Sequence, residues 1–309
     1  MVKDRVLWLD YAKAISISLV VMFHATLGVG NAMGGTGFMH DVIAFATPFR
    51  MPDFFLLSGF LVPRIVGKSW STVFERRVLF YGYFYVLWLT IQFGFKAPHF
   101  AAEMGWGGVL SAYAMAFVQP FGTLWFIVVL PVFYVFAKAT SRLATVVVLA
   151  AALALHLAEV HTGWMVIDEV SKHLFYFLVG YRLSEALTVL ATTTARRPLA
   201  AAAGIGAWAL LHGATIGYAT IPGLDVVFAL AGTAAMVATG GVLSRLPGLG
   251  WMRWIGKNTI VIYLAFFLPM AVSRTVLVKL GLVADVGLAS FIVWLTAMVV
   301  PVAIYFAIR

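Results

Sequence analysis

The sequence contains no cysteine, and only 11% of its 309 residues are charged. Without cysteine there can be no disulfide, no thiolate metal ligand and no thioester-forming nucleophile, so any covalent chemistry must use other atoms. The scarcity of charge, together with 63% hydrophobic residues, excludes a soluble globular domain, because water cannot solvate so apolar a chain. The composition therefore indicates a polytopic membrane protein.

Apolar segments long enough to cross a membrane recur along the whole chain. A spanning helix needs about 20 mostly apolar residues, and we predict an all-α fold with about ten transmembrane helices. They cover residues 6–29, 42–63, 78–95, 121–137, 143–160, 170–187, 199–214, 224–242, 259–272 and 286–308. A shorter apolar stretch, 106–118, is expected to lie in the interface or to dip back into the membrane. We expect residues 1–309 to form a single integral membrane domain, with no separate soluble domain.

The basic residues are distributed unevenly between the two sides of this predicted topology. Fifteen of the 21 lysines and arginines fall in one set of connections, which includes Lys3, Arg5 and Arg309. The opposite set holds Lys96, Lys172, Arg274 and Lys279, and the remaining two basic residues lie inside predicted helices. Because basic connections stay in the cytoplasm, we place both termini there. The net charge of +9 then reflects topology, and we expect membrane lipids, not nucleic acid, as the anionic partner.

A glycine cluster follows the first predicted helix, in "GVGNAMGGTG" at residues 28–37. It lacks the preceding strand and following helix that a phosphate-binding loop needs. We interpret it as a flexible turn on the outer side of the membrane.

The first helix, "LDYAKAISISLVVMFHA", carries a lysine and a histidine in an apolar setting. Lys13 and His24 are eleven positions apart, which is about three helical turns, so they line one stripe about 16 Å apart. A structural explanation stays open for each, because a lysine can snorkel to the interface and a histidine can bond a neighbouring helix.

The second helix holds a denser polar group, in "TPFRMPDFFLLSGFLVPR". Arg50 and Asp53 are one turn apart near mid-membrane, where a charge costs several kcal/mol unless it is paired or faces a cavity, so we expect them to pair. Pro48 and Pro52 remove backbone donors, which predicts a kinked helix that is buried or lines a cavity. Ser58 continues the polar series toward the cytoplasm.

Two further clusters of polar residues are candidate ligand sites. Four basic residues follow the second helix and can hold a nucleotide-like polyanion, although topology alone also accounts for them: Arg64, Lys68, Arg76 and Arg77. Glu169 and His173 are i,i+4 partners, with His161 and Asp168 nearby, but their spacing matches no zinc signature and we predict no metal site.

Three stretches together resemble the acyltransferase-3 family of integral membrane acyltransferases: "RVLWLDYAKAISISLVVMFHA", "FFLLSGFLVPR" and "GTLWFIVVLPVFYV". The resemblance implies transfer of an acyl group, often acetyl, from cytoplasmic acyl-CoA to cell-surface glycans or other extracytoplasmic acceptors. It also implies that His24 is the catalytic histidine and Lys13 its basic partner. The chain departs from the family where "YAKA" replaces the usual Leu-Arg-Gly, and where Phe80 stands in place of the second arginine of Arg-x-x-Arg.

On this basis we predict a multi-pass enzyme of the bacterial inner membrane that acylates a carbohydrate or lipid-linked glycan. His24 acts as general base or as nucleophile, and we predict no permanently bound cofactor, with acyl-CoA as donor substrate. Candidate donors to the tetrahedral intermediate are Arg50, Ser58 and the Trp125 indole, and Asp53 is expected to orient Arg50. The residues predicted to bind the donor are Lys13, Arg64, Arg76, Arg77 and Trp125.

The same intramembrane charges also fit a proton-coupled transporter or a lipid flippase. Transporters commonly have two matching halves, whereas the polar residues here crowd into the first two predicted helices, which favours an enzyme with one site. A sensor or scaffold is a third possibility, but it leaves the buried charges unexplained.

Overall fold

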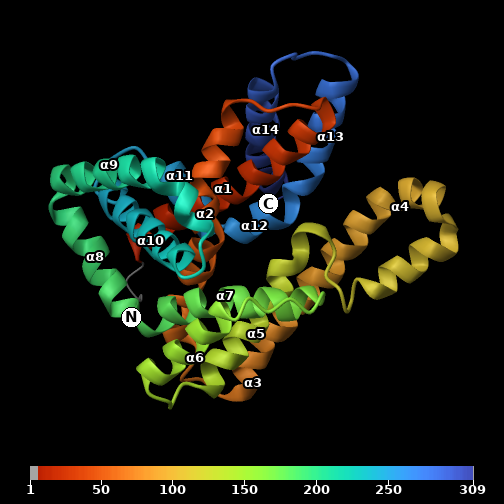
Figure 1. The fold of residues 1–309 in the computed structure, drawn as a ribbon. Helices are drawn as coiled ribbons and strands as arrows, with labels where there is room; N and C mark the ends of the chain where they lie inside the picture. The colour runs from red at the N-terminus through yellow and green to blue at the C-terminus, as the bar shows by residue number, and fades with distance from the viewer. Residues whose placement is uncertain (1–5, 309) are drawn as a thin grey trace. The chain divides into compact units, whose positions relative to one another are not determined.

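The computed structural model describes residues 6–308, which are helical throughout their regular structure, with no strand among them (Figure 1). The chain divides into two compact units, Met1–Leu57 with Leu183–Arg309, and Ser58–Arg182. We call these the terminal unit and the central unit. Lys3, Arg5 and Arg309, which the sequence analysis assigned to the cytoplasmic side, lie outside the described residues.

The terminal unit is built around one apolar helix, α1 (Leu7–Met33). The other helices of this unit are α2 (Phe38–Gly59), which ends in the central unit, α8 (Ser184–Arg196), α9 (Pro198–Thr215), α10 (Leu224–Leu243), α11 (Gly250–Lys257), α12 (Thr259–Ala265), α13 (Phe267–Lys279) and α14 (Val286–Ala307). Helices α10, α11 and α14 pack directly on α1. Because neighbours cover it on several sides, α1 is apolar around most of its circumference.

Glycines bring two of these neighbours unusually close to α1. A Cβ atom placed on Gly256 of α11 would lie 1.7 Å from the Asp10 carbonyl oxygen, and one on Gly240 of α10 would lie 2.5 Å from the Trp8 carbonyl oxygen. Backbone can approach backbone at these points only because glycine has no side chain. The small residues therefore set the distance between α1 and its neighbours.

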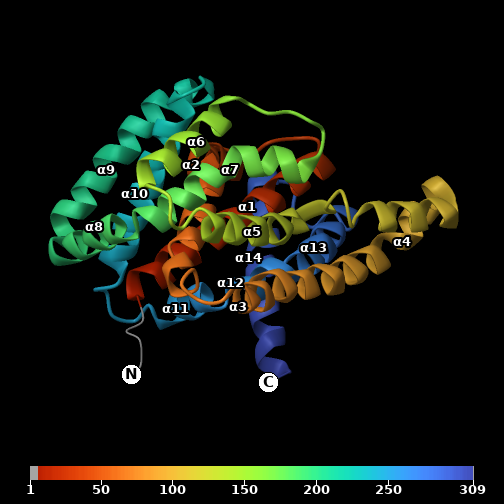
Figure 2. The same ribbon diagram turned by 90° about the horizontal axis from the view of Figure 1, so that it is seen from below.

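The central unit contains α3 (Trp70–Val73), a π-helical turn (Phe74–Leu79), α4 (Phe80–Met115), α5 (Trp125–Ala139), α6 (Thr145–Leu157) and α7 (Met165–Arg182), with short 3-10 turns at Val62–Arg64 and Gly122–Leu124. Helix α4 turns back on itself, as Figure 2 shows, because Gly105 leaves helical geometry with φ 69° and ψ 167°. The two limbs are joined by a hydrogen bond of 2.8 Å between the Thr90 and Tyr113 hydroxyls. Residues 106–118, predicted to be interfacial or re-entrant, form most of the returning limb.

All ten predicted spans are helical, but the number of helices that can cross a membrane differs from the prediction. Six described helices are long and apolar enough, or eight when the bent pairs α7 with α8 and α12 with α13 each count as one span. The two remaining predicted spans correspond to α2, which carries Asp41, Arg50 and Asp53, and α6, which has only 13 residues. The charged residues of α2 and the short length of α6 therefore account for the difference between ten predicted spans and eight.

The glycine cluster is only partly a turn, so this prediction was wrong for its first half. Helix α1 continues to Met33, and Gly34, with φ 69°, ends it by donating its N–H to the Gly30 carbonyl over 2.8 Å. Gly28 and Gly30 are therefore helical residues that pack against side chains from other parts of the terminal unit.

Candidate active site

His24 lies on α1 and is half-buried. The ring stacks on Phe266, with 5.7 Å between ring centroids and 30° between the planes, and meets the edge of Phe23 at 5.4 Å. Phe266 stands at the break between α12 and α13, where the two helix axes bend by 47°. The break between α12 and α13 thus places an aromatic ring against the imidazole.

Arg50 of α2 comes close to the same place. Its guanidinium carbon lies 3.5 Å from the centroid of the Phe23 ring, which also contacts the His24 ring. The residue is only 8% exposed, and the buried Nη1 atom has no hydrogen-bond partner among the described residues. An unmatched buried donor is costly, so its retention beside a histidine suggests that it serves a bound group.

Asp53 is fully buried one turn further along α2. The Ser16 hydroxyl of α1 faces it, yet neither carboxylate oxygen is within hydrogen-bonding geometry of a described residue. The predicted pairing of Arg50 with Asp53 was therefore wrong. The guanidinium lies over the Phe23 ring instead, a cation–π contact that repays part of its desolvation.

The other predicted residues occupy separate places. Lys13 is a partly exposed residue of α1, three turns before His24. Ser58 is the first residue of the central unit, and its carbonyl oxygen accepts a hydrogen bond of 3.4 Å from the Tyr134 hydroxyl. The described contacts thus join His24 with Arg50, whereas Ser58 has a backbone contact within the central unit.

The predicted basic cluster forms a pocket in the central unit. The lining residues of this cavity of about 360 Å³ are Arg64, Ile65, Lys68, Arg76, Arg77 and Phe80. Lys138 of α5 holds the segment that carries Lys68 by donating to the Val66 carbonyl at 3.0 Å and the Lys68 carbonyl at 2.5 Å. The pocket is large enough for a small ligand group, and its cations suit phosphates.

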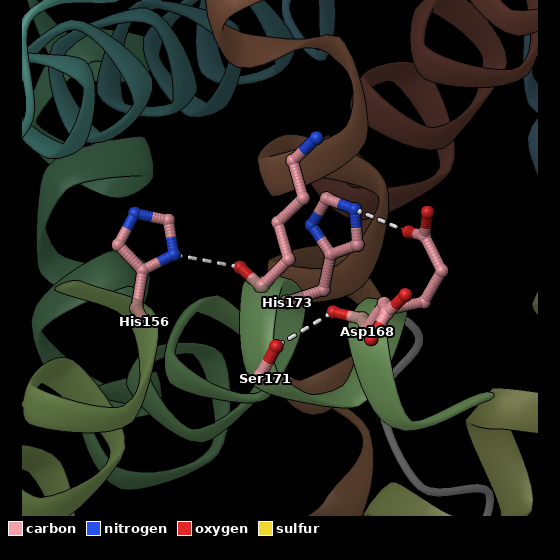
Figure 3. A network of polar contacts seen from close by, with 6 residues as sticks. His156, Asp168, Ser171 and His173 are labelled. Atoms are coloured by element: carbon pink, nitrogen blue, oxygen red, sulfur yellow. Dashed lines mark hydrogen bonds and ion pairs between the residues drawn. The ribbon is translucent and has the colours of Figure 1, made fainter. Parts of the chain in front are cut away.

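A polar network lies along α7, as Figure 3 shows. The Nε2 atom of His173 is 3.0 Å from Glu169 Oε2, which confirms that these i,i+4 residues share a face. The Trp125 indole stacks on the His173 ring, with 5.9 Å between centroids and 22° between planes. Asp168, in the first turn of the helix, accepts hydrogen bonds from Thr162 and Gly163 in the segment that precedes it. Among residues 6–308, no three His, Cys, Asp or Glu side chains gather in a way that could hold a metal ion.

Several residues at these sites escaped sequence reasoning. Phe266 and Ser16 have no distinguishing pattern, because their roles depend on contacts between distant helices. Lys138 was counted only as a topological charge. Arg274 was assigned to an outer connection, whereas the structure places it within α13.

Comparison with known proteins places the chain in a family. The model of the acyltransferase domain Acyl_transf_3 matches residues 6–308. The chain belongs to the acyltransferase-3 family. The inner membrane protein YcfT of Escherichia coli (strain K12) is 25% identical over 238 residues, a match that covers 67% of this chain and 66% of the relative. No solved structure matches. The protein is thus a multi-pass membrane member of an acyltransferase family, which favours the enzyme over the transporter or flippase.

Proposed function

We propose that this protein transfers an acetyl group from cytoplasmic acetyl-CoA to a hydroxyl of an extracytoplasmic glycan or lipid-linked glycan. The observation that carries the proposal is the combination of a half-buried histidine, His24, with a buried guanidinium, Arg50, whose Nη1 lacks a hydrogen-bond partner among the described residues. A proton acceptor next to an unmatched cationic donor is what acyl transfer requires, because charge moves onto the carbonyl oxygen during the reaction.

The reaction can follow two routes from this arrangement. In the first, His24 takes the proton of the acceptor hydroxyl as its oxygen attacks the thioester carbonyl. Arg50 donates to the resulting oxyanion, the C–S bond then breaks, and the imidazolium returns the proton to the departing thiolate. In the second, the imidazole attacks the thioester carbonyl, the C–S bond breaks, and coenzyme A leaves as a thiol with the imidazole proton. The acceptor hydroxyl then attacks the acetyl-histidine, the C–N bond breaks, and the hydroxyl proton ends on the imidazole.

The basic pocket of the central unit supports the choice of donor. Coenzyme A carries a diphosphate and a 3′-phosphate, and guanidinium groups bind phosphates with paired hydrogen bonds. We assign the phosphates to Arg64, Lys68, Arg76 and Arg77. We also assign Lys13 and Trp125 to binding of the donor, as the sequence analysis predicts. Lys13 lies on the same stripe of α1 as His24.

The test is acetyl transfer by the purified protein. With [14C]acetyl-CoA, the wild type is expected to hydrolyse the thioester slowly or to transfer the label, and His24→Gln is expected to lose about 100- to 10,000-fold of this activity. His99→Gln is the matched control, because the His99 side chain is 75% exposed and lies in the other unit. A His24→Gln protein that works at the wild-type rate would refute the proposal.

The two routes are separated by incubation without acceptor. Label that stays on the denatured wild-type protein and is absent from His24→Gln supports the acetyl-histidine route. Hydrolysis without bound label supports general base catalysis.

A further inference from the structure

Arg274 of α13 lies directly against α1. A Cβ atom built on Gly28 would be only 2.6 Å from Arg274 Nη1, closer than real Cβ contacts come. Because Gly28 has no side chain, the Arg274 guanidinium can lie against the backbone of α1 at this point. This glycine belongs to the cluster that sequence reasoning assigned to a flexible turn.

The position of the guanidinium relative to His24 follows from two contacts. Gly28 comes four residues after His24, so the two share one face of α1 at one turn's separation. Phe266, which stacks on the His24 ring, immediately precedes α13, the helix that carries Arg274. The beginning of α13 therefore meets His24, and the Arg274 guanidinium lies about one turn further toward the C-terminal end of α1.

Arg274 has an incomplete environment. It is partly exposed, and no described residue forms a hydrogen bond or an ion pair with its guanidinium. It also belongs to the bent pair of α12 and α13, which together are apolar enough to span a membrane. A charged side chain in such a segment is costly unless it faces water or a counter-ion, so this arginine has capacity for an anion.

We propose that Arg274 binds a carboxylate or phosphate of the acceptor, which makes the preferred acceptor an anionic, hydroxylated compound such as an acidic glycan. This rests on the proposed function, in which His24 receives the proton of the acceptor hydroxyl. Positions 24 and 28 are about one helical turn, roughly 5 Å, apart along α1, a spacing comparable to that between a hydroxyl and an acidic group on the same sugar ring. Arg50 of α2, buried against Phe23, then serves the oxyanion, while Arg274 holds the fixed charge of the acceptor.

The test compares acceptors that differ only in charge. Glucuronic acid and glucuronamide are offered with [14C]acetyl-CoA, and the ratio of their kcat/KM values is measured in each variant. If Arg274 forms a hydrogen-bonded charge pair with the carboxylate, the wild type is expected to have a kcat/KM roughly 10- to 100-fold higher for the acid than for the amide. Arg274→Gln is expected to bring the ratio close to one. The ratio is internally normalised, so a smaller folded fraction cannot imitate this result.

Two further variants sharpen the comparison. Gly28→Ala keeps the charge but displaces the guanidinium, so it is expected to lower the ratio as well. Lys279→Gln removes an exposed charge from the same helix and is expected to keep the wild-type ratio. A parallel arm with glucose 6-phosphate and glucose shows whether a phosphate serves in place of the carboxylate.

The assignment is overturned if the wild type shows no preference for either anionic acceptor, or if Arg274→Gln retains that preference. Failure of the proposed function has a different signature, because acetyl-CoA hydrolysis itself would then not depend on His24.

Discussion

Arg50 is the residue whose chemistry depends most on the shape of its side chain. Lysine at this position keeps the positive charge but loses the planar fork that reaches both the Phe23 ring and a bound group. We expect Arg50→Lys to lower kcat by about 100- to 1,000-fold and to leave the KM for acetyl-CoA nearly unchanged, because an oxyanion contact is made mainly in the transition state. Steady-state kinetics on purified protein measure both constants.

The control for Arg50 is Phe23→Leu, which removes the ring and keeps the guanidinium. It is expected to cost less in kcat than Arg50→Lys. A higher KM with unchanged kcat in Arg50→Lys would show instead that Arg50 binds the donor in its ground state.

Sequence reasoning found the polar residues of this site but not their contacts. The spacing of Lys13 and His24 and the charge at Arg50 were visible because charges are rare in apolar helices. The partner of Arg50 was not, because the competition between Asp53 and the Phe23 ring depends on how α1 and α2 pack. Phe266 was invisible for the same reason, since an apolar residue in an apolar helix gives no signal.

Among the elements, the end of α2 shows why the Ser-Gly-Phe stretch needs its glycine. A Cβ atom on Gly59 would lie 1.9 Å from the Phe177 carbonyl oxygen of α7, and a backbone atom cannot rotate away. We expect Gly59→Ala to destabilise the protein by about 1–3 kcal/mol through overpacking. Thermal unfolding in detergent, followed by tryptophan fluorescence, measures the effect.

Gly82→Ala is the matched control for Gly59→Ala. It lies in α4, where a Cβ atom would have no neighbour within 4 Å, and alanine favours a helix by about 1 kcal/mol. Its melting temperature should equal or exceed that of the wild type. Equal melting temperatures for both alanine variants would contradict the close approach of α2 and α7.

The position of Lys68, which lines the basic pocket, depends on α5, because Lys138 donates hydrogen bonds to the carbonyls of Val66 and Lys68. We expect Lys138→Met to raise the KM for acetyl-CoA by about tenfold with little change in kcat, since the connection that carries Lys68 loses its tether. Arg142→Met, which removes an exposed charge just beyond α5, should leave the KM unchanged. A loss confined to kcat in Lys138→Met would contradict this positioning role.

Apolar runs predicted the helical segments well, but they could not predict where packing extends or breaks a helix. Gly28 and Gly30 belong to a glycine-rich pattern that is typical of a turn. Helix α1 nevertheless continues through them, and Arg274 and His40 pack against its backbone there. The break at Phe266 and the return of α4 at Gly105 are likewise set by tertiary contacts and local φ, which a hydropathy pattern does not record.

For the whole molecule, the proposed reaction requires a direction across the membrane. In that reaction the donor comes from the cytoplasm and the acceptor from outside, which requires the Lys13 end of α1 to face the cytoplasm and the His24 end to face the exterior. The charge distribution predicts this orientation, because the topology predicted from the sequence assigns 15 basic residues to one side and four to the other.

The absence of native cysteine makes this orientation directly testable, because every label reports an introduced thiol. Thr36→Cys lies in the exposed turn between α1 and α2, and Leu246→Cys lies in the turn between α10 and α11. With a membrane-impermeant maleimide on intact spheroplasts, we expect labelling at residue 36 and none at residue 246 until the membrane is permeabilised. The reverse pattern would place His24 near the cytoplasmic face, where an extracytoplasmic acceptor could not reach it, and the proposed direction of acetyl transfer would have to be abandoned.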